Sequence, residues 1–161
     1  EGLGEARSRA KTLHIDDRVL FTGADPDVGF WLSKMDGFLL LSEFEGLPNV
    51  LIEAQLAGIP VISTPAGGAA ETFEPSITGL LLSSAAHPDP NEVVRALRFL
   101  AENPVLRARM GAFGARVTRP RYALAQILER TVRLLKGPNP EATTQSPQAV
   151  LPPSPRRSAT R

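Results

Sequence analysis

Two glutamates near the middle of the chain carry its clearest chemical signal. They stand in the stretch "SEFEGLPNVLIEAQLAGIPVIS", where Glu45 precedes a Gly-Leu-Pro turn and Glu53 follows eight residues later. Pro48 is typical of the first turn of a helix, because its ring fixes φ and it has no N–H to lose there. We therefore expect a helix that begins near Pro48, with Glu45 in the loop before it and Glu53 inside it.

The predicted helix start suits an anionic or polyhydroxylated ligand. The first amides, including those of Asn49 and Val50, have no intrahelical acceptor, and the positive end of the helix dipole lies behind them. Glu53 is one turn beyond Asn49, so both share a face. A carboxylate accepts hydrogen bonds at both oxygens, which matches the vicinal hydroxyls of a ribose. The pattern fits a nucleotide sugar with its ribose at Glu53 and its hexose at Glu45; two solvated surface charges are the alternative.

Short apolar runs alternate with helical patterns through the first half of the chain. The runs that predict strands are bounded by Gly, Pro or Ser and lie at residues 18–23, 37–42, 60–64 and 79–83. The helical patterns between them lie at residues 5–13, 27–34, 48–57 and 69–73. This alternation predicts an α/β fold with an open parallel sheet of the doubly wound type. Such sheets bind ligands outside the carboxyl ends of their strands, where both glutamates are expected.

The second half of the chain predicts helices followed by a tail. Residues 90–136 carry apolar side chains at helical spacing and predict about three helices packed beside the sheet. Residues 137–161 are rich in Pro, Ser and Thr and have no periodicity, which predicts disorder. The expected organisation is therefore one domain over residues 1–136 and a disordered tail over residues 137–161.

The composition excludes several classes of function. The chain has 161 residues, a net charge of +1, no cysteine and only two histidines. Thiolate zinc sites and cysteine nucleophiles are thus excluded, and no general attraction to nucleic acid is expected. No apolar run reaches the roughly 20 residues of a membrane span. We expect a cytoplasmic protein; peripheral contact of the basic tail with the inner membrane is an open alternative.

The stretch "EGLPNVLIEAQLAGIPVIST" resembles the retaining GT-B glycosyltransferases of family 4, whose carboxy-terminal domain carries an E-x7-E motif. Three further segments match that family in order. "RVLFTG" is similar to the strand before its nucleotide-base loop, "MDGFLLLS" to the next strand, and "TPAGGAAETF…TGLLL" to its Gly-Gly-x-x-Glu loop and the strand that follows. The resemblance covers about residues 2–82 closely and the helices up to residue 135 loosely.

The resemblance implies a Rossmann-like donor-binding domain and assigns its residues. Glu53 would bind the donor ribose, and Glu45 would lie at the donor sugar near the reacting carbon. The other donor-binding candidates are backbone and glycine positions, namely Gly23, Gly46, Leu47, Asn49, Val50, Gly67 and Gly68. The implied reaction transfers a sugar from a nucleotide diphosphate sugar to an acceptor hydroxyl with retention, in polysaccharide or glycolipid synthesis. The implied partners are the donor and a sugar or lipid-linked acceptor.

The chain also departs from the family pattern. The Arg and Lys that neutralise the diphosphate in the family have no counterpart here, and neither has the amino-terminal Rossmann-like domain. We therefore expect a truncated chain that is inactive alone. Two functions stay open, a transferase represented by its donor-binding domain and a nucleotide-sugar-binding fragment without transfer activity. A sugar-nucleotide epimerase fits the E-x7-E stretch less well.

Two other motifs have competing interpretations. Asp25-Pro26-Asp27 is formally a D-x-D metal motif, but Asp27 stands before a periodic run, and we favour a helix cap. No metal or other cofactor is therefore expected. Gly67 and Gly68 stand in "AGGAAE", which can form either a ligand loop, since paired glycines let the backbone approach a phosphate, or a plain strand-to-helix turn.

Overall fold

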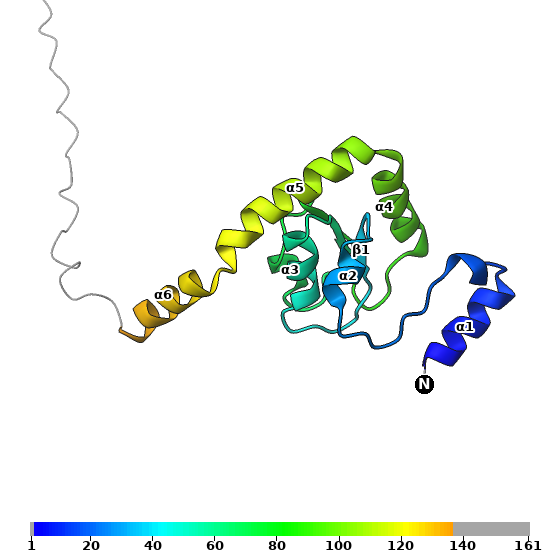
Figure 1. Cartoon of the computed structure of the whole chain (residues 1–161), viewed down its shortest axis with the longest axis horizontal. Helices are drawn as coiled ribbons and strands as arrows, with labels where there is room; N and C mark the ends of the chain where they lie inside the picture. Colours follow the sequence, from blue (N-terminus) through cyan, green and yellow to red (C-terminus); the bar gives the residue numbers. More distant parts are fainter. Residues whose placement is uncertain (1, 137–161) are drawn as a thin grey trace, which may run out of the picture. The chain divides into compact units, whose positions relative to one another are not determined.

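The computed structural model describes residues 2–136, which form two compact units (Figure 1). The first unit ends at Pro120, and the second begins at Arg121. The tail expected at residues 137–161 lies outside the described residues, so its predicted disorder stays a prediction.

A parallel three-stranded sheet organises the first unit. Its strands are β1 (Phe38–Leu40), β2 (Val61–Ser63) and β3 (Gly79–Leu81), in the order β1-β2-β3. Leu39 is paired with Ile62, which is paired in turn with Leu80. Because all the strands run the same way, their carboxyl ends meet at one edge. The predicted α/β fold with an open parallel sheet is confirmed.

One face of the sheet is covered by α2 (Val28–Leu32) and α3 (Asn49–Leu56). Val61 of β2 packs there against Leu51 and Ala54 of α3, and all three side chains are fully buried. The helix forms because apolar residues recur at helical spacing on the side that meets the sheet. This packing fixes which side of α3 faces outward.

The opposite face is covered by α4 (Pro90–Glu102) and α5 (Pro104–Arg121). Ile62, the neighbour of Val61 on β2, points to this side, because successive strand residues alternate between faces. It clusters with Leu100 of α4 and Met110 of α5, and all three are buried. A strand buried on both faces explains the continuous apolar run in the sequence.

The carboxyl end of α3 is closed by a Schellman motif. Gly58 has a φ of +80° and donates its N–H to the carbonyl of Gln55 at 2.9 Å. The N–H of Ile59 bonds the carbonyl of Ala54, also at 2.9 Å. These two bonds satisfy carbonyls that the helix end would otherwise leave open, and they turn the chain into β2.

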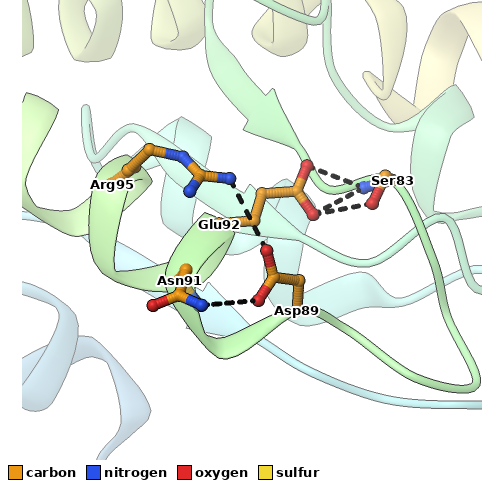
Figure 2. A network of polar contacts seen from close by, with 5 residues as sticks. All are labelled: Ser83, Asp89, Asn91, Glu92 and Arg95. Atoms are coloured by element: carbon orange, nitrogen blue, oxygen red, sulfur yellow. Dashed lines mark hydrogen bonds and ion pairs between the residues drawn. The ribbon is translucent and has the colours of Figure 1, made fainter.

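A polar network joins the carboxyl end of β3 to the first turn of α4 (Figure 2). Asp89 caps the helix by accepting from the amide of Asn91 at 2.9 Å, and Arg95 lies 3.7 Å from its other oxygen. The carboxylate of Glu92 accepts from the amide of Ser83 at 3.0 and 3.1 Å and from its hydroxyl at 2.8 Å. Glu92 therefore anchors the chain where it leaves the sheet.

The prediction of a strand at residues 18–23 is wrong. The chain there follows α1 (Gly2–Thr12) and a 3-10 turn, η1 (Asp16–Arg18), and continues without a strand. Val19 is locally extended, with φ −119° and ψ 120°, and Leu20 is 74% exposed. Within the described part of the chain, the sheet contains no strand that pairs with this segment. An apolar run adopts an extended conformation readily, but it becomes a strand only when a neighbour supplies the ladder hydrogen bonds.

One helix prediction needs correction. The helix expected at residues 69–73 is a short 3-10 helix, η2 (Ala69–Glu71). Of the three later helices, α4 and α5 pack on the sheet as expected, whereas α6 (Leu124–Leu135) belongs to the second unit, so its packing beside the sheet stays a prediction. Among residues 2–136, no helix combines the length and the apolar character needed to cross a membrane.

Candidate functional site

The start of α3 presents free backbone donors at the carboxyl edge of the sheet. Pro48 is the N-cap, with φ −73° and ψ 97°, and its carbonyl accepts the amide of Leu51 at 3.1 Å. The amides of Asn49 and Val50 have no acceptor among the described residues. Two N–H groups and the positive end of the helix dipole therefore remain for a ligand with oxygen acceptors.

A buried threonine holds together the two loops that leave β1 and β2. Thr64 follows β2 directly and is fully buried. Its amide donates to the carbonyl of Leu40 at 3.1 Å, and its hydroxyl donates to the carbonyl of Ser42 at 2.6 Å. These bonds continue the β1–β2 pairing past the last strand residues, so that the loops emerge side by side.

The glycine pair after β2 lies directly against the loop that carries Glu45. The amide of Gly68 donates to the carbonyl of Gly46 at 2.7 Å. Gly67 has a φ of +48°, and a Cβ built on it would fall 1.8 Å from the carbonyl oxygen of Glu45. A Cβ on Gly68 would lie 3.3 Å from Cδ1 of Leu47. Only glycine permits this approach, so the two loops form one backbone platform.

Both glutamates are free to meet a ligand. Glu45 is half-buried in the loop, and Glu53 is exposed on α3. Neither carboxylate has a hydrogen-bond or ion-pair partner among the residues that the structure describes. Asn49 is also exposed and lies one turn from Glu53 on the same helix face, while Leu51 on the opposite face is buried.

Eight of the nine predicted site residues thus lie on connected elements at one edge of the sheet. They are Glu45, Gly46, Leu47, Asn49, Val50, Glu53, Gly67 and Gly68. Gly23 differs from them. It is exposed with a φ of +69°, and a Cβ built on it would meet no atom within 4 Å, so no close approach explains the glycine there. The roles assigned to all nine residues stay predictions.

Asp25 and Asp27 order the turn before α2. Asp27 accepts from the amide of Phe30 at 2.9 Å, which confirms the predicted helix cap. Asp25 accepts from the amide of Asp27 at 2.9 Å and from the indole N–H of Trp31 at 3.0 Å. These two donors hold the pKa of the Asp25 carboxyl below its ordinary value of 3.8, the backbone amide having the larger effect. The described residues include no group of three side chains suited to a metal ion, and metal-independent binding stays a prediction.

Gln55 is a buried polar residue with several partners that the sequence interpretation did not single out. Its side chain is fully buried on the packed side of α3, and it bonds groups from three other segments. The signal was present in the sequence, because Gln55 is four residues from Leu51 and so falls on the apolar face. A buried amide at such a position requires partners, and these can be identified only once the chain is folded.

The family follows from a match along most of the chain. The family model described as "Glycosyl transferases group 1" matches residues 2–117. The chain belongs to the group 1 glycosyl transferases. The matched range contains the sheet, α3, the glycine pair and both glutamates.

Two curated relatives of this chain illustrate the likeness in sequence. The Vi polysaccharide biosynthesis protein VipC/TviE of Salmonella typhi is 59% identical over 81 residues, which is 50% of this chain and 14% of that protein. The N-acetyl-alpha-D-glucosaminyl L-malate synthase of Bacillus anthracis is 46% identical over 71 residues, 44% of this chain and 19% of that protein. The chain therefore spans less than a fifth of the length of either relative.

Solved structures show the same fold. Anabaena Alr3699/HepE, crystallised in complex with UDP, superposes with a TM-score of 0.75 over 83% of this chain and 36% of that chain, at 23% identity. The C-terminal domain of the group 1 glycosyl transferase LpcC from Francisella tularensis gives a TM-score of 0.64 over 75% of this chain and 62% of that chain, at 20% identity. A GT-B type of Rossmann-like fold is thus confirmed for this chain.

A separate cleft of about 600 Å³ lies away from the predicted site. It is formed where α5 meets the turn at Ser76 and Ile77, which precedes β3. That turn is at the amino end of the strand, whereas the glutamates lie at the carboxyl ends. Phe113 lies under the guanidinium of Arg116 in this cleft, with 4.6 Å between the ring centroid and Cζ. None of the predicted donor-binding residues lines it.

Proposed function

We propose that the chain is the donor-binding domain of a retaining glycosyltransferase. It would bind a nucleotide diphosphate sugar and serve its transfer to an acceptor hydroxyl in polysaccharide or glycolipid synthesis. The family supports this proposal, as do relatives named for Vi polysaccharide biosynthesis and for lipopolysaccharide core biosynthesis. The fold is that of proteins crystallised with UDP and UDP-glucose, which supports a nucleotide sugar as the donor.

The observation that carries the proposal is the convergence of two free amides, a close-packed glycine loop and two free carboxylates at one edge of the sheet. The unpaired amides of Asn49 and Val50 offer hydrogen bonds to phosphate or sugar oxygens. The Gly67–Gly68 loop packs its backbone directly against the loop that carries Glu45, and so supports that loop. Unpaired Glu53 and Glu45 accept from the ribose and sugar hydroxyls respectively.

The reaction we propose is a front-face transfer with retention. The bond between the anomeric carbon and the leaving phosphate oxygen breaks, and the acceptor oxygen bonds to the anomeric carbon on the same face. The acceptor proton passes to the leaving phosphate, so that no protein base is needed for that step. Glu45 near the reacting carbon would stabilise the sugar as positive charge develops on it.

The acceptor and a further Rossmann-like domain are proposed partners. An acceptor must be oriented and water excluded, and domain closure does both in two-domain enzymes. We expect little or no transfer by the 161-residue chain alone. Because this chain spans only 14% and 19% of the two relatives above, a second candidate is a nucleotide-sugar-binding fragment without transferase activity. Peripheral contact with the inner membrane and a cytoplasmic location stay proposals.

Calorimetric titration with UDP, GDP and UDP-glucose tests the proposal. A hydrogen bond to a charged group contributes about 1.5–3 kcal/mol, so Glu53→Ala should weaken nucleoside diphosphate binding about tenfold or more. Glu45→Ala should leave the bare diphosphate unaffected and weaken only the intact nucleotide sugar. Glu43→Ala is the matched control, since Glu43 is an exposed glutamate in the same loop outside the predicted site. If Glu45→Ala weakened UDP as much as Glu53→Ala does, the assigned roles would be wrong.

A further inference from the structure

We propose that Gln55 is a positioning residue that aligns α3 with the glycine loop, and thereby holds the donor site in its binding geometry. This inference rests on the donor-binding function proposed above. Gln55 lies two residues beyond Glu53, on the opposite, buried side of α3. The contacts of its side chain determine how the helix is rotated about its axis, and so where Glu53 points.

The nitrogen of the Gln55 side chain connects two elements. Nε2 donates to the carbonyl of Leu51 in the same helix at 3.1 Å and to the carbonyl of Thr72 at 2.8 Å. Thr72 is the residue that closes η2, and its hydroxyl donates to the carbonyl of Ala69 at 2.7 Å. The bond to Thr72 therefore joins α3 to the short helix that follows the glycine pair.

The oxygen of the same amide connects two more segments. Oε1 accepts from the hydroxyl of Thr78, before β3, at 3.1 Å and from the hydroxyl of Thr118, on α5, at 3.3 Å. Gln55, Thr78 and Thr118 are each no more than 2% exposed. The amide cannot turn over, since its oxygen would then face two carbonyl oxygens, neither of which can donate.

A short and stiff route leads from Gln55 to the donor platform. Gly68 is the N-cap of η2 and Thr72 its C-cap, so about 8 Å of 3-10 helix separates them. The amide of Gly68 in turn bonds the carbonyl of Gly46, next to Glu45. The Gln55 side chain therefore fixes the rotation of α3, on which Glu53 lies, and the position of the glycine loop that supports Glu45. Sites of this kind lose affinity when the residues that support them are released, because the geometry must hold to within about half an ångström.

The full chain and four variants test the proposal. Gln55→Met keeps the length of the side chain and removes every hydrogen bond, whereas Gln55→Glu keeps the acceptor oxygen and removes both N–H donors. Thr118→Val removes one bond to the Gln55 oxygen and keeps both bonds of the nitrogen, so it measures how much the oxygen side of the network contributes. Thr131→Val, whose hydroxyl bonds only the carbonyl of Ile127 in α6, controls for loss of a threonine hydroxyl.

Two measurements are made at a temperature where every variant is folded. The first is amide hydrogen exchange of Gly68 in the ligand-free chain, compared with exchange of Ile62 in the sheet. The second is the affinity for UDP by calorimetry. Both Gln55 variants should accelerate exchange at Gly68 about tenfold without changing Ile62, and should weaken UDP about fivefold or more. Thr118→Val should change both readings less than either Gln55 variant does, because the bond from Gln55 to Thr72 is kept, and Thr131→Val should leave both unchanged.

The outcomes separate this proposal from the donor-binding function. If the Gln55 variants lost only thermal stability, with Gly68 protection and UDP affinity as in the unmodified chain, Gln55 would be structural and the proposal overturned. Failure of both Gln55 variants to fold, while Thr118→Val folds, would also overturn it in favour of a role in folding. If the unmodified chain bound neither UDP nor GDP, the donor function would fail, and exchange at Gly68 alone would decide whether Gln55 positions the loop.

Discussion

Replacing Gly67 with alanine should damage both the fold and the site, by two separable physical effects. A φ of +48° is unfavourable for alanine by about 1–2 kcal/mol. The new methyl group would also fall 1.8 Å from the carbonyl oxygen and 2.8 Å from the carbonyl carbon of Glu45, so the two loops must separate. That movement breaks the bond between Gly68 and Gly46, which contributes about 1 kcal/mol. We expect a total loss of about 3 kcal/mol in the free energy of unfolding.

Two other glycines separate the contributions. Gly58 has a φ of +80° with nothing within 4 Å of a built Cβ, so Gly58→Ala reports the cost of the dihedral angle alone, about 1 kcal/mol. Gly111 lies within α5, and a Cβ on it would fall 1.8 Å from the carbonyl oxygen of Gly58. Gly111→Ala therefore measures the cost of a steric overlap with backbone at the same 1.8 Å distance as in Gly67→Ala, at a place away from the glutamates.

The assay is urea unfolding together with calorimetric binding of UDP. Gly67→Ala should lose stability and also weaken UDP at least about tenfold in the protein that remains folded. Gly58→Ala and Gly111→Ala should lose stability and bind UDP normally. The reasoning would be refuted if Gly67→Ala bound UDP like the unmodified chain, or if it were destabilised no more than Gly58→Ala.

Three further predictions concern other parts of the chain. A chelator should leave the UDP affinity unchanged, because helix-start amides replace a cation. A large loss of UDP affinity on chelation, absent in the Asp27→Ala variant, would contradict this. Because its pKa is lowered, Asp25 stabilises the fold above pH 3.8, its ordinary value, and this contribution is lost as the pH falls through the folded-state pKa. Urea unfolding followed by Trp31 fluorescence should therefore show a smaller loss of stability on acidification in Asp25→Asn than in the unmodified chain, and equal pH profiles would refute the assignment. His14 follows α1 with a φ of +53°. The substitution His14→Gly should therefore raise the free energy of unfolding by about 1 kcal/mol, as measured by thermal unfolding.

Local sequence signals predicted the elements that local chemistry controls. The apolar runs at β1, β2 and β3 were found because burial on both faces leaves an uninterrupted apolar run. The beginning of α3 was found because Pro48 fixes its own dihedral angle, and the cap at Asp27 because its carboxylate reaches an amide three residues away. Each of these signals acts within a few residues along the chain.

The segment at residues 18–23 shows where such signals fail. It has the apolar pattern of a buried element, yet Leu20 is 74% exposed. A pattern records which residues could be buried, and burial needs a second surface, which no local signal identifies. The same limit explains η2, where a helical pattern of five residues shortens to a 3-10 turn beside the glycine pair.

The sequence by itself determined the family resemblance, the parallel α/β sheet and the placement of Glu45 and Glu53 around a helix start. Those features follow from spacing along the chain, which a linear pattern contains in full. Only the tertiary structure decided that the Gly67–Gly68 loop lies against Gly46, and that one buried amide, Gln55, joins α3, the end of η2, the turn before β3 and α5. These contacts join residues up to 63 positions apart in sequence. They form because the parallel strands bring their loops to one edge, and because a buried polar group must find its partners wherever the packed chain supplies them.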